Sequence, residues 1–485
     1  MVFSSNIFLF LFLPLVLLVY LLAGNRARNM VLLCASLFFY AWGESLYLIV
    51  MLFSIASNYV FGLSIDNAKR QGKSGLVPLV LAVAANLGML AFFKYANFFI
   101  LNVNTVFSAL QLAPIVMKPV HLPIGISFFT FQALSYILDL YWRKTEIQKN
   151  PFHFALYISL FPQLIAGPIV RYQDVASEIK TRFVTQEDFV YGIRRFILGL
   201  GKKVLIANAL GRAADYIFIL PPERIPLSLA WLGAISYTLQ IYFDFSGYSD
   251  MAIGLGRMFG FHFLENFNYP YIARSIREFW RRWHISLSSW FRDYLYIPLG
   301  GNKGSGGRTY MNLLVVFFLC GLWHGASWNF VIWGLFHGSF LVLERIRLVQ
   351  KILKALPALL QHLYVMLVVT VGWVFFRADS LSYALGYLKA MITPSTPPFF
   401  NSHIFLALNL EFYCMLILAV IGSAPLALYV ARLDTWQPQL QTFLTGYKIE
   451  RLLSVFSFCF LAFVLLYSIA SLQGGAHNPF LYFRF

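Results

Sequence analysis

His324 lies near the middle of the long uncharged stretch Thr309–Leu343. This stretch is long enough for two helices, and Gly321, Gly325 and Gly334 are the candidate bends. A histidine at membrane depth is costly unless it is paired, which makes it a candidate for function. Imidazole, with an unperturbed pKa of about 6.5, suits general-base catalysis at neutral pH. The neighbouring Gly321 and Gly325 carry no side chains, so another backbone or a substrate can approach. The alternative is a histidine that hydrogen-bonds between helices. We favour that interpretation for His337, which lies about 140° away on an ideal helix.

Aromatic and basic residues alternate along Arg277–Gly301. At about 100° per helical residue, the large apolar side chains fall on one arc: Trp280, Trp283, Leu287, Trp290, Phe291 and Tyr294. The other positions carry Arg277, Arg281, Arg282, Ser288, Arg292 and Asp293, with His284 near the boundary. Such a helix is predicted to lie in the membrane interface rather than to cross the bilayer. It is either a membrane anchor or part of a catalytic or donor-binding site, and the adjacent uncharged span favours the site.

Several polar side chains interrupt another apolar region: Gln240, Asp244, Ser246, Tyr248 and Asp250. In contact with lipid they would cost several kcal/mol, so we expect them to line an aqueous passage or to pair with arginines. The stretch Phe161–Arg171 contains two prolines and a glycine, which predict a broken or re-entrant helix. Together with Pro123–Gln132 it is expected to form a wall around a cavity.

The composition places all these residues in a membrane protein. Of the 485 residues, 59% are hydrophobic and 12% are charged, and the mean hydropathy is +0.69, which excludes a water-soluble globular protein. Uncharged stretches recur along the chain, and we expect about eleven to thirteen membrane segments, some of them re-entrant. The net charge of +17 indicates cytoplasmic loops rather than nucleic-acid binding. The same rule places the N-terminus outside and Asp66–Gly75 inside.

Charge divides the chain into three predicted parts: N-terminal membrane helices in 1–118, a catalytic core in 119–345 and C-terminal membrane helices in 346–485. More than half of the Lys, Arg, Asp and Glu residues lie between Arg143 and Arg308, which makes the middle part the predicted site of function. The four cysteines show no metal-ligand spacing, and the sequence has no phosphate-binding loop, nucleophile elbow or HExxH pattern. We therefore expect no bound metal.

Several motifs, in order over about residues 1–380, resemble the membrane-bound O-acyltransferase family. They are LPIGISFFTFQ (Leu122–Gln132), FPQLIAGPIVR (Phe161–Arg171), QIYFDFSGYSDMAIGLG (Gln240–Gly256), ENFNYPY (Glu265–Tyr271), EFWRRWHISLSSWFRDYLYIPLGGN (Glu278–Asn302) and GLWHGASWNFVIWG (Gly321–Gly334). The last two are the most specific. The resemblance implies an all-α polytopic membrane fold with re-entrant and interfacial helices. It also implies a cytoplasmic and a periplasmic funnel that meet near the midplane.

The resemblance also implies roles for individual residues. His324 takes the place of the family's catalytic histidine, His284 that of a second functional histidine in the bacterial alginate-type branch, and Asp293 that of a carboxylate in the same motif. The expected co-substrate is a thioester donor, acetyl-CoA or an acyl-carrier thioester, with no tightly bound cofactor. Donor binding is expected of Arg281, Arg282, Trp283 and Arg292. Channel lining is expected of Gln240, Asp244, Ser246, Tyr248, Asp250, Trp323 and Trp328.

The expected function is acetyl transfer from a cytoplasmic donor across a bacterial inner membrane. A periplasmic acetyltransferase partner would then modify a polysaccharide such as alginate, which this multi-pass chain would contact only indirectly. Two alternatives stay open in addition to a purely structural assembly subunit, for which changing His324 would not affect product chemistry. One is D-alanyl transfer to teichoic acid from a carrier protein. The other is a transporter or flippase without covalent chemistry, which buried polar clusters and broken helices would also suit.

Overall fold

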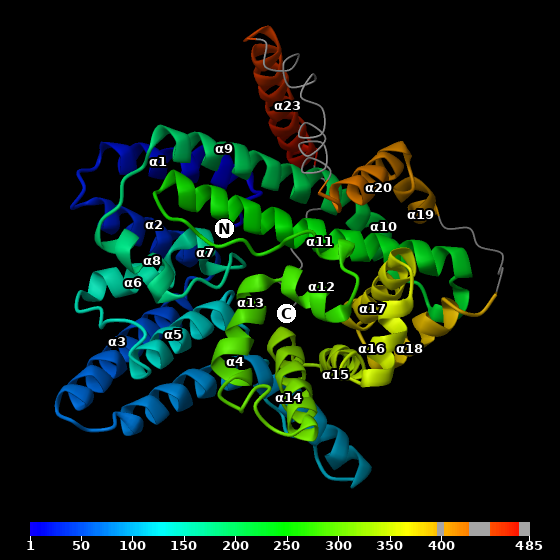
Figure 1. Cartoon of the computed structure of the whole chain (residues 1–485), viewed down its shortest axis with the longest axis horizontal. Helices are drawn as coiled ribbons and strands as arrows, with labels where there is room; N and C mark the ends of the chain where they lie inside the picture. Colours follow the sequence, from blue (N-terminus) through cyan, green and yellow to red (C-terminus); the bar gives the residue numbers. More distant parts are fainter. Residues whose placement is uncertain (395–401, 426–446, 475–485) are drawn as a thin grey trace.

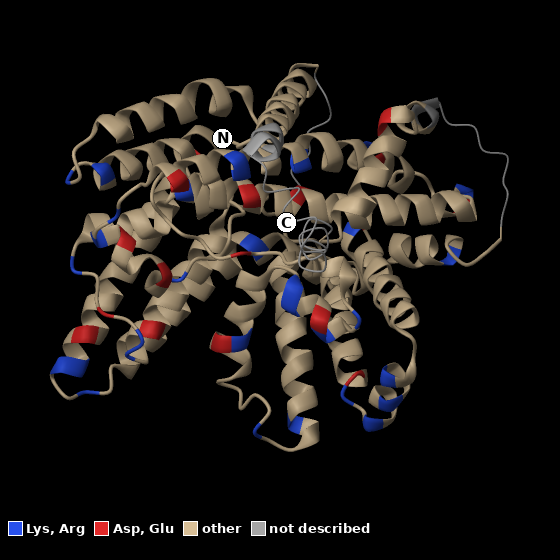
Figure 2. Cartoon of the chain, turned by 45° about the horizontal axis from the view of Figure 1, so that its top comes forward, with Lys and Arg blue, Asp and Glu red and all other residues tan. Residues whose placement is uncertain are grey.

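The computed structural model describes residues 1–394, 402–425 and 447–474, and these residues form helices without any β-strand (Figure 1). Four helices are long and apolar enough to cross a membrane: α3 (Leu48–Arg70), α4 (Leu76–Ala109), α17 (Ala358–Arg377) and the part Ser454–Gln473 of α23 (Tyr447–Gln473). Figure 2 shows most charged residues at helix ends and in connecting turns. The all-α polytopic class is therefore confirmed, while the number of membrane segments stays a prediction.

The remaining helices are shorter, and several of them are broken. The N-terminal part adds the π-helix η1 (Phe8–Phe12), α1 (Leu13–Leu22) and α2 (Arg28–Gly43). The middle part contains α5 (Ile126–Tyr141), α6 (Pro151–Ser159), α7 (Phe161–Leu164), α8 (Tyr172–Lys180), α9 (Gln186–Gly201), the π-helix η2 (Lys202–Ala207), α10 (Asn208–Phe218), η3 (Pro222–Arg224), α11 (Leu227–Met258), η4 (Pro270–Ile272), α12 (Ile276–Arg282), α13 (Ile285–Phe291), the π-helix η5 (Arg292–Tyr296), α14 (Gly306–His324) and α15 (Trp328–Leu343). The C-terminal part contains α16 (Arg347–Ala355), α18 (Leu381–Ala390), α19 (Ser402–Ala407) and α20 (Leu410–Gly422). The predicted part 346–485 also includes residues outside the described ranges.

The long helix α11 runs beside α9 through the centre of the molecule (Figure 1). Two glycine pairs bring the backbones into contact. A Cβ on Gly199 would lie 2.6 Å from the carbonyl oxygen of Gly247, and one on Gly192 would lie 2.6 Å from that of Gly254. This close approach lets α9 cover the polar stretch of α11. That stretch does not interrupt the helix, because α11 continues through it to Met258.

The predicted break in Phe161–Arg171 is confirmed. α6 ends at Ser159, α7 makes a single turn, and α8 does not begin until Tyr172. The second predicted wall segment packs directly on this break. Gly125 has a φ of +78°, and a Cβ there would lie 2.8 Å from the carbonyl oxygen of Leu164. Glycine is required at this position because other residues rarely adopt that conformation and would also collide.

The uncharged stretch Thr309–Leu343 forms two helices that pack as a hairpin, as its length predicts. α14 ends at His324 and α15 begins at Trp328, so the chain turns at Gly325. Gly321 and Gly334, which the sequence also offered as bends, lie inside the helices instead. They allow the two backbones to touch, because a Cβ on Gly321 would collide with the carbonyl of Phe330.

The prediction of a single helix over Arg277–Gly301 is wrong. The segment is divided into α12, α13 and η5, and the break between α12 and α13 falls at His284, whose φ is +44°. The six side chains of the predicted apolar arc are buried inside the protein, whereas an interfacial helix would turn them towards lipid. Helical periodicity indicates a buried face even where the helix itself is interrupted.

Candidate active site

His324 is the last residue of α14 and is 6% exposed. Three aromatic rings surround its imidazole edge-on: Trp323 and Trp333 at 5.0 Å and Phe376 at 5.2 Å between ring centroids. Its Nδ1 is buried without a hydrogen-bond partner. A buried polar atom left unpaired is unusual in a folded protein and needs an explanation. The aromatic cage fixes the ring and leaves that nitrogen without a partner inside the protein.

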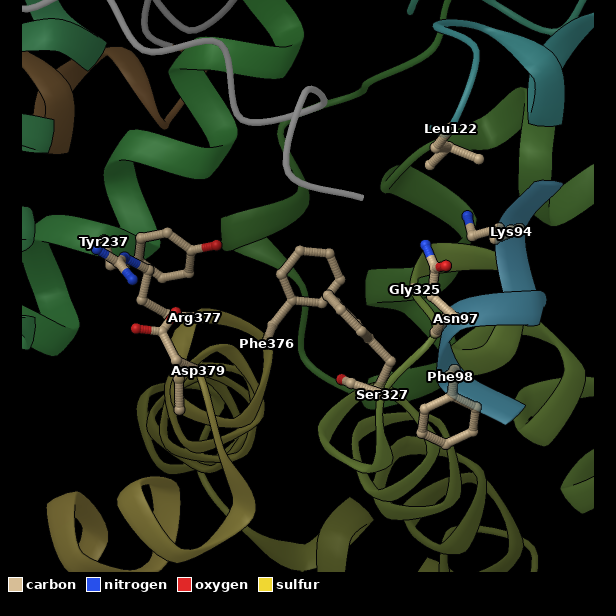
Figure 3. A pocket seen from close by; sticks show the side chains of 13 residues that line it. Lys94, Asn97, Phe98, Leu122, Tyr237, Gly325, Ser327, Phe376, Arg377 and Asp379 are labelled. Carbon is tan, nitrogen blue, oxygen red and sulfur yellow. The ribbon is translucent and has the colours of Figure 1, made fainter. Parts of the chain in front are cut away.

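An outer cavity of about 370 Å³ begins at the residue after His324 (Figure 3). Gly325 and Phe376 form part of its wall, and Lys94 from α4 forms another part. In Figure 3, Lys94 lies on one side of the cavity and Arg377 on the other, with Phe376 between them. Phe376 lines this cavity and also packs against the His324 ring, so the imidazole lies directly behind the cavity wall.

An inner cavity of about 360 Å³ lies along the earlier part of α14. It extends as far as Cys320, one helical turn before His324. Its wall carries four arginines: Arg277, Arg281, Arg292 and Arg345. The outer cavity lies at the C-terminal end of α14, so the two cavities approach His324 from opposite ends of this helix.

His284 is buried beside the inner cavity, whose wall begins at the next residue, Ile285. Its Nδ1 lies 3.1 Å from Oδ1 of Asn266. The same oxygen accepts the backbone N–H of Ser286 at 3.2 Å, which fixes it as the acceptor end of the amide. Nδ1 of His284 therefore carries the proton and donates it, and Nε2 is left as a buried acceptor without a partner. The ring of Trp323 lies between the two histidines, 6.2 Å from His284 and 5.0 Å from His324.

Two side chains of α4 hold the end of α14 that carries His324. The ammonium of Lys94 donates to the backbone oxygen of Trp323 and to that of His324, the latter at 3.3 Å. The hydroxyl of Tyr95 donates to the oxygen of Leu322 at 2.6 Å. Carbonyl groups at a helix C-terminus have no partner within the helix, and a cation there is favourable. Lys94 is 7% exposed, and none of the ion pairs among the described residues includes it.

Sequence reasoning did not single out Lys94 or Tyr95. A signal was present, because Lys94 is the one charged residue in the apolar segment Leu76–Ala109. The sequence does not show that this charge meets residues more than two hundred positions further along the chain. Asn266, which orients His284, lies within a quoted motif but was not assigned a role.

Asp293 lies away from the aromatic cage of His324 and joins two basic residues. It bonds Arg171 at 2.8 Å and Arg292 at 2.6 Å. Burial alone would raise the pKa of this carboxyl, but the hydrogen bonds and charges of Arg292 and Arg171 hold the pKa below its ordinary value. Asp293 thus links η5 to Arg171, the residue that precedes α8. A catalytic role for Asp293 stays a prediction.

The expected donor-binding residues occupy two different places. Arg281 and Arg292 line the inner cavity, where a phosphorylated donor could meet them. Arg282 instead bonds Glu278 at 2.9 Å. Trp283 is buried and packs 4.9 Å from the ring of Trp373.

The residues expected to line a channel also separate. Asp244 pairs with Lys203 at 2.6 Å, and Asp250 pairs with Arg195 and Lys202 at 2.6 Å each. Gln240, Ser246 and Tyr248 are buried in the same helix, and none of these five residues lines the inner or the outer cavity. Trp323 stands between the two histidines, whereas Trp328 is 56% exposed and bonds Asn102 at 3.0 Å.

His337 is fully buried among Trp280, Trp333 and Phe336, with ring centroids 5.1 to 5.4 Å away. Both its ring nitrogens lack a hydrogen-bond partner. No hydrogen bond between helices is found for His337 among the described residues, and its structural role stays a prediction.

Comparison with known proteins agrees with this arrangement. The family model described as MBOAT, membrane-bound O-acyltransferase family, matches residues 125–376, which contain both histidines and the inner cavity. The chain is 48% identical to the probable alginate O-acetylase AlgI of Pseudomonas aeruginosa, over 82% of this chain and 76% of that protein. It is 38% identical to the peptidoglycan O-acetyltransferase of Helicobacter pylori, over 81% of this chain and 80% of that protein. It is also 32% identical to the teichoic acid D-alanyltransferase of Bacillus subtilis, over 44% of this chain and 56% of that protein.

The family match covers more than half of the chain, and the similarity to the Pseudomonas protein extends over most of both sequences. The buried histidines and the inner cavity lie within the region matched by the family model, which also supplies part of the wall of the outer cavity. The chain therefore belongs to the membrane-bound O-acyltransferase family and is a membrane-embedded O-acyltransferase.

Proposed function

We propose that this chain moves an acetyl group from a cytoplasmic thioester donor across a bacterial inner membrane for the O-acetylation of a polysaccharide such as alginate. The observation that carries the proposal is the position of His324 between two cavities, one reaching Gly325 and the other reaching Cys320. A donor and an acceptor could then meet at one imidazole without either crossing the membrane. Holding both reactants close together and correctly oriented supplies much of the rate enhancement of a bimolecular transfer.

In the proposed step, His324 takes the proton of the acceptor hydroxyl while the hydroxyl oxygen attacks the thioester carbonyl. The carbon–sulfur bond then breaks, and the leaving thiolate receives the proton. A general base of this kind contributes about 10²- to 10⁴-fold to the rate. His284 presents an accepting Nε2, which suits holding a hydroxyl or thiol in place.

The inner cavity suits the donor. Its arginines, among them Arg281 and Arg292, offer fixed positive charge to the phosphates of acetyl-CoA or of an acyl-carrier prosthetic group. The relatives that act on alginate and peptidoglycan match over four fifths of this chain, whereas the D-alanyltransferase matches over less than half. This difference favours acetyl over D-alanyl transfer. A periplasmic acetyltransferase partner would complete the delivery to the polymer.

The test is His324→Ala, with His262→Gln as a matched control that changes an exposed histidine outside the cavities. Cells that make the polymer are supplied with labelled acetate, and the O-acetyl content of the polymer is measured. We expect His324→Ala to lose about 10²-fold or more of the label while the protein still inserts in the membrane, and His262→Gln to keep it. Undiminished acetylation by His324→Ala would contradict the proposal.

A donor assay on the purified chain separates the alternatives. Label from acetyl-CoA or an acetyl-carrier thioester supports acetyl transfer, and label from a D-alanyl carrier supports the teichoic-acid reaction. Transport of an unmodified substrate with no label transferred would indicate a flippase.

A further inference from the structure

A third cavity is larger than the two beside His324, and the transfer reaction does not use it. This basin of about 1100 Å³ lies at the end of α3, beside the ends of α5 and α8. Six basic side chains line it against two acidic ones. The basic residues are Lys69, Arg70, Arg143, Lys144, Lys149 and Lys180. The charge pattern of the sequence assigns this face to the cytoplasm.

Four of the six basic residues in the basin have a partner, and one of these four is Lys144, whose ammonium lies 4.6 Å from the ring centroid of Trp142. Arg70 pairs with Asp66 at 2.8 Å, and Lys180 lies 3.8 Å from Glu146. Lys69 donates to the backbone oxygen of Tyr141. Arg143, Lys144 and Lys149 belong to none of the ion pairs found in the described residues. Like charges held close together repel one another, so an anion bound between them would be favoured.

Arg143 occupies a backbone position that normally belongs to glycine. Its φ is +59°, and it follows the end of α5 at Tyr141. The N–H of Arg143 donates to the oxygen of Leu140 at 3.1 Å, and the N–H of Lys144 donates to that of Asp139 at 2.8 Å. These two bonds define a helix-ending turn in which glycine is strongly preferred. A strained residue persists where its side chain has a function, and here that side chain lines the basin.

The same turn is connected to the segment that follows His284. The hydroxyl of Tyr294 donates to Asp139 at 2.7 Å, and its ring stacks on Trp142 with the planes 7° apart. Tyr294 lies in η5, next in the chain to Asp293, which forms an ion pair with Arg171. Occupancy of the basin would therefore stabilise the turn that supports the active-site segment.

We propose that this basin binds a phosphorylated ligand, with the guanidinium of Arg143 contacting a phosphate and the ammonium groups of Lys144 and Lys149 flanking it. Arginine offers a planar fork that matches phosphate oxygens, and lysine adds point charges. A single carboxylate would not need three cations. The chemistry is shared by a soluble nucleotide and by the headgroup of an anionic phospholipid. The proposal concerns binding and does not depend on the transfer reaction.

The test uses Arg143→Gly, which removes the side chain and also relieves the backbone strain, so the variant should fold at least as well as the wild type. Lys73→Gln is the matched control. Lys73 lies in the turn that follows α3, close in sequence to Lys69 and Arg70, but it does not line the basin. The full chain is placed in nanodiscs of neutral phosphatidylcholine. One arm titrates 3′,5′-ADP, and the other adds phosphatidylglycerol to the nanodisc; thermal unfolding and direct binding are measured in both.

We expect at least one arm to raise the melting temperature of the wild type, and Arg143→Gly to weaken that binding about tenfold. Lys73→Gln should bind like the wild type. A response to 3′,5′-ADP identifies a soluble phosphate ligand, and a response to phosphatidylglycerol identifies a lipid headgroup. If Arg143→Gly is unstable, the double variant Lys144→Gln/Lys149→Gln replaces it with the same expectation. Absence of a response in both arms, or unchanged binding by the variants, would overturn the proposal.

Discussion

The buried charges between α9 and α11 are paired, whereas those around His324 are not. Asp244 and Lys203 are 2% exposed and lie 2.6 Å apart, and Asp250 is held by Arg195 and Lys202. At the other site, the ammonium of Lys94 meets backbone oxygens and no carboxylate. Nδ1 of His324 and Nε2 of His284 have no partner at all.

This difference separates scaffold from active site. A buried charge costs several kcal/mol unless it is paired, so the charge pairs between α9 and α11 can serve as a scaffold. Buried polar groups without a partner are destabilising, and those that lie beside a cavity, as at His284, are placed to bond a substrate. The polar stretch of α11 attracts attention in the sequence because it is unusual, yet it holds helices together. The chemistry belongs to the less conspicuous groups around His324.

The largest expected effect on stability concerns the paired layer. Asp244→Ala leaves Lys203 buried without its partner, which should lower the free energy of unfolding by about 3–5 kcal/mol. Thermal or denaturant unfolding in detergent measures it. The double variant Asp244→Leu/Lys203→Met should recover much of the loss, since it removes both charges. A loss below about 1 kcal/mol in Asp244→Ala would show that the pair contributes little.

The next effect concerns the unpaired site. Lys94→Met leaves two buried carbonyl groups without a donor and frees the end of α14, so kcat should fall about 10²-fold with little change in KM. Tyr95→Phe removes a neutral hydrogen bond from the neighbouring carbonyl and is the matched control, with an expected loss of about threefold. Steady-state kinetics with a thioester donor measure both. Equal losses of kcat in Lys94→Met and Tyr95→Phe would mean that the charge of Lys94 contributes no more to the reaction than a neutral hydrogen bond does.

The smallest expected effect concerns Asp293. Its pKa in the folded protein is held below the ordinary value of 3.8, so its pairing stabilises the fold above that pH and the contribution disappears as the pH falls below it. The wild type should therefore lose more stability than Asp293→Asn as the pH falls from about 5 to about 3. Unfolding measured over this range checks the sign. Parallel curves for the two proteins would contradict it.

The sequence predicts those parts of the molecule that depend on local pattern. The buried arc of Trp280, Trp283 and their neighbours follows from helical periodicity, and the break near Pro162 follows from the missing N–H of proline. The helix end at Gly325 was also among the bends that the glycines suggested.

Contacts between distant segments could not be predicted in the same way. The division at His284 depends on Asn266, whose amide accepts two bonds from the start of α13. The support of His324 comes from Lys94 on α4, far away in the sequence. The pairing of Asp244 requires the π-helix η2, whose extra residue per turn no local pattern reveals.

The central proposal is that the two cavities beside His324 open on opposite sides of the membrane. Cysteine accessibility tests it directly, in a variant whose native cysteines Cys34, Cys320, Cys414 and Cys459 are replaced by serine. Ser327→Cys reports on the outer cavity and Ser288→Cys on the inner one. With a membrane-impermeant thiol reagent added to one side at a time, we expect Ser327→Cys to react only from the periplasmic side and Ser288→Cys only from the cytoplasmic side. Reaction of both positions from the same side would contradict the account.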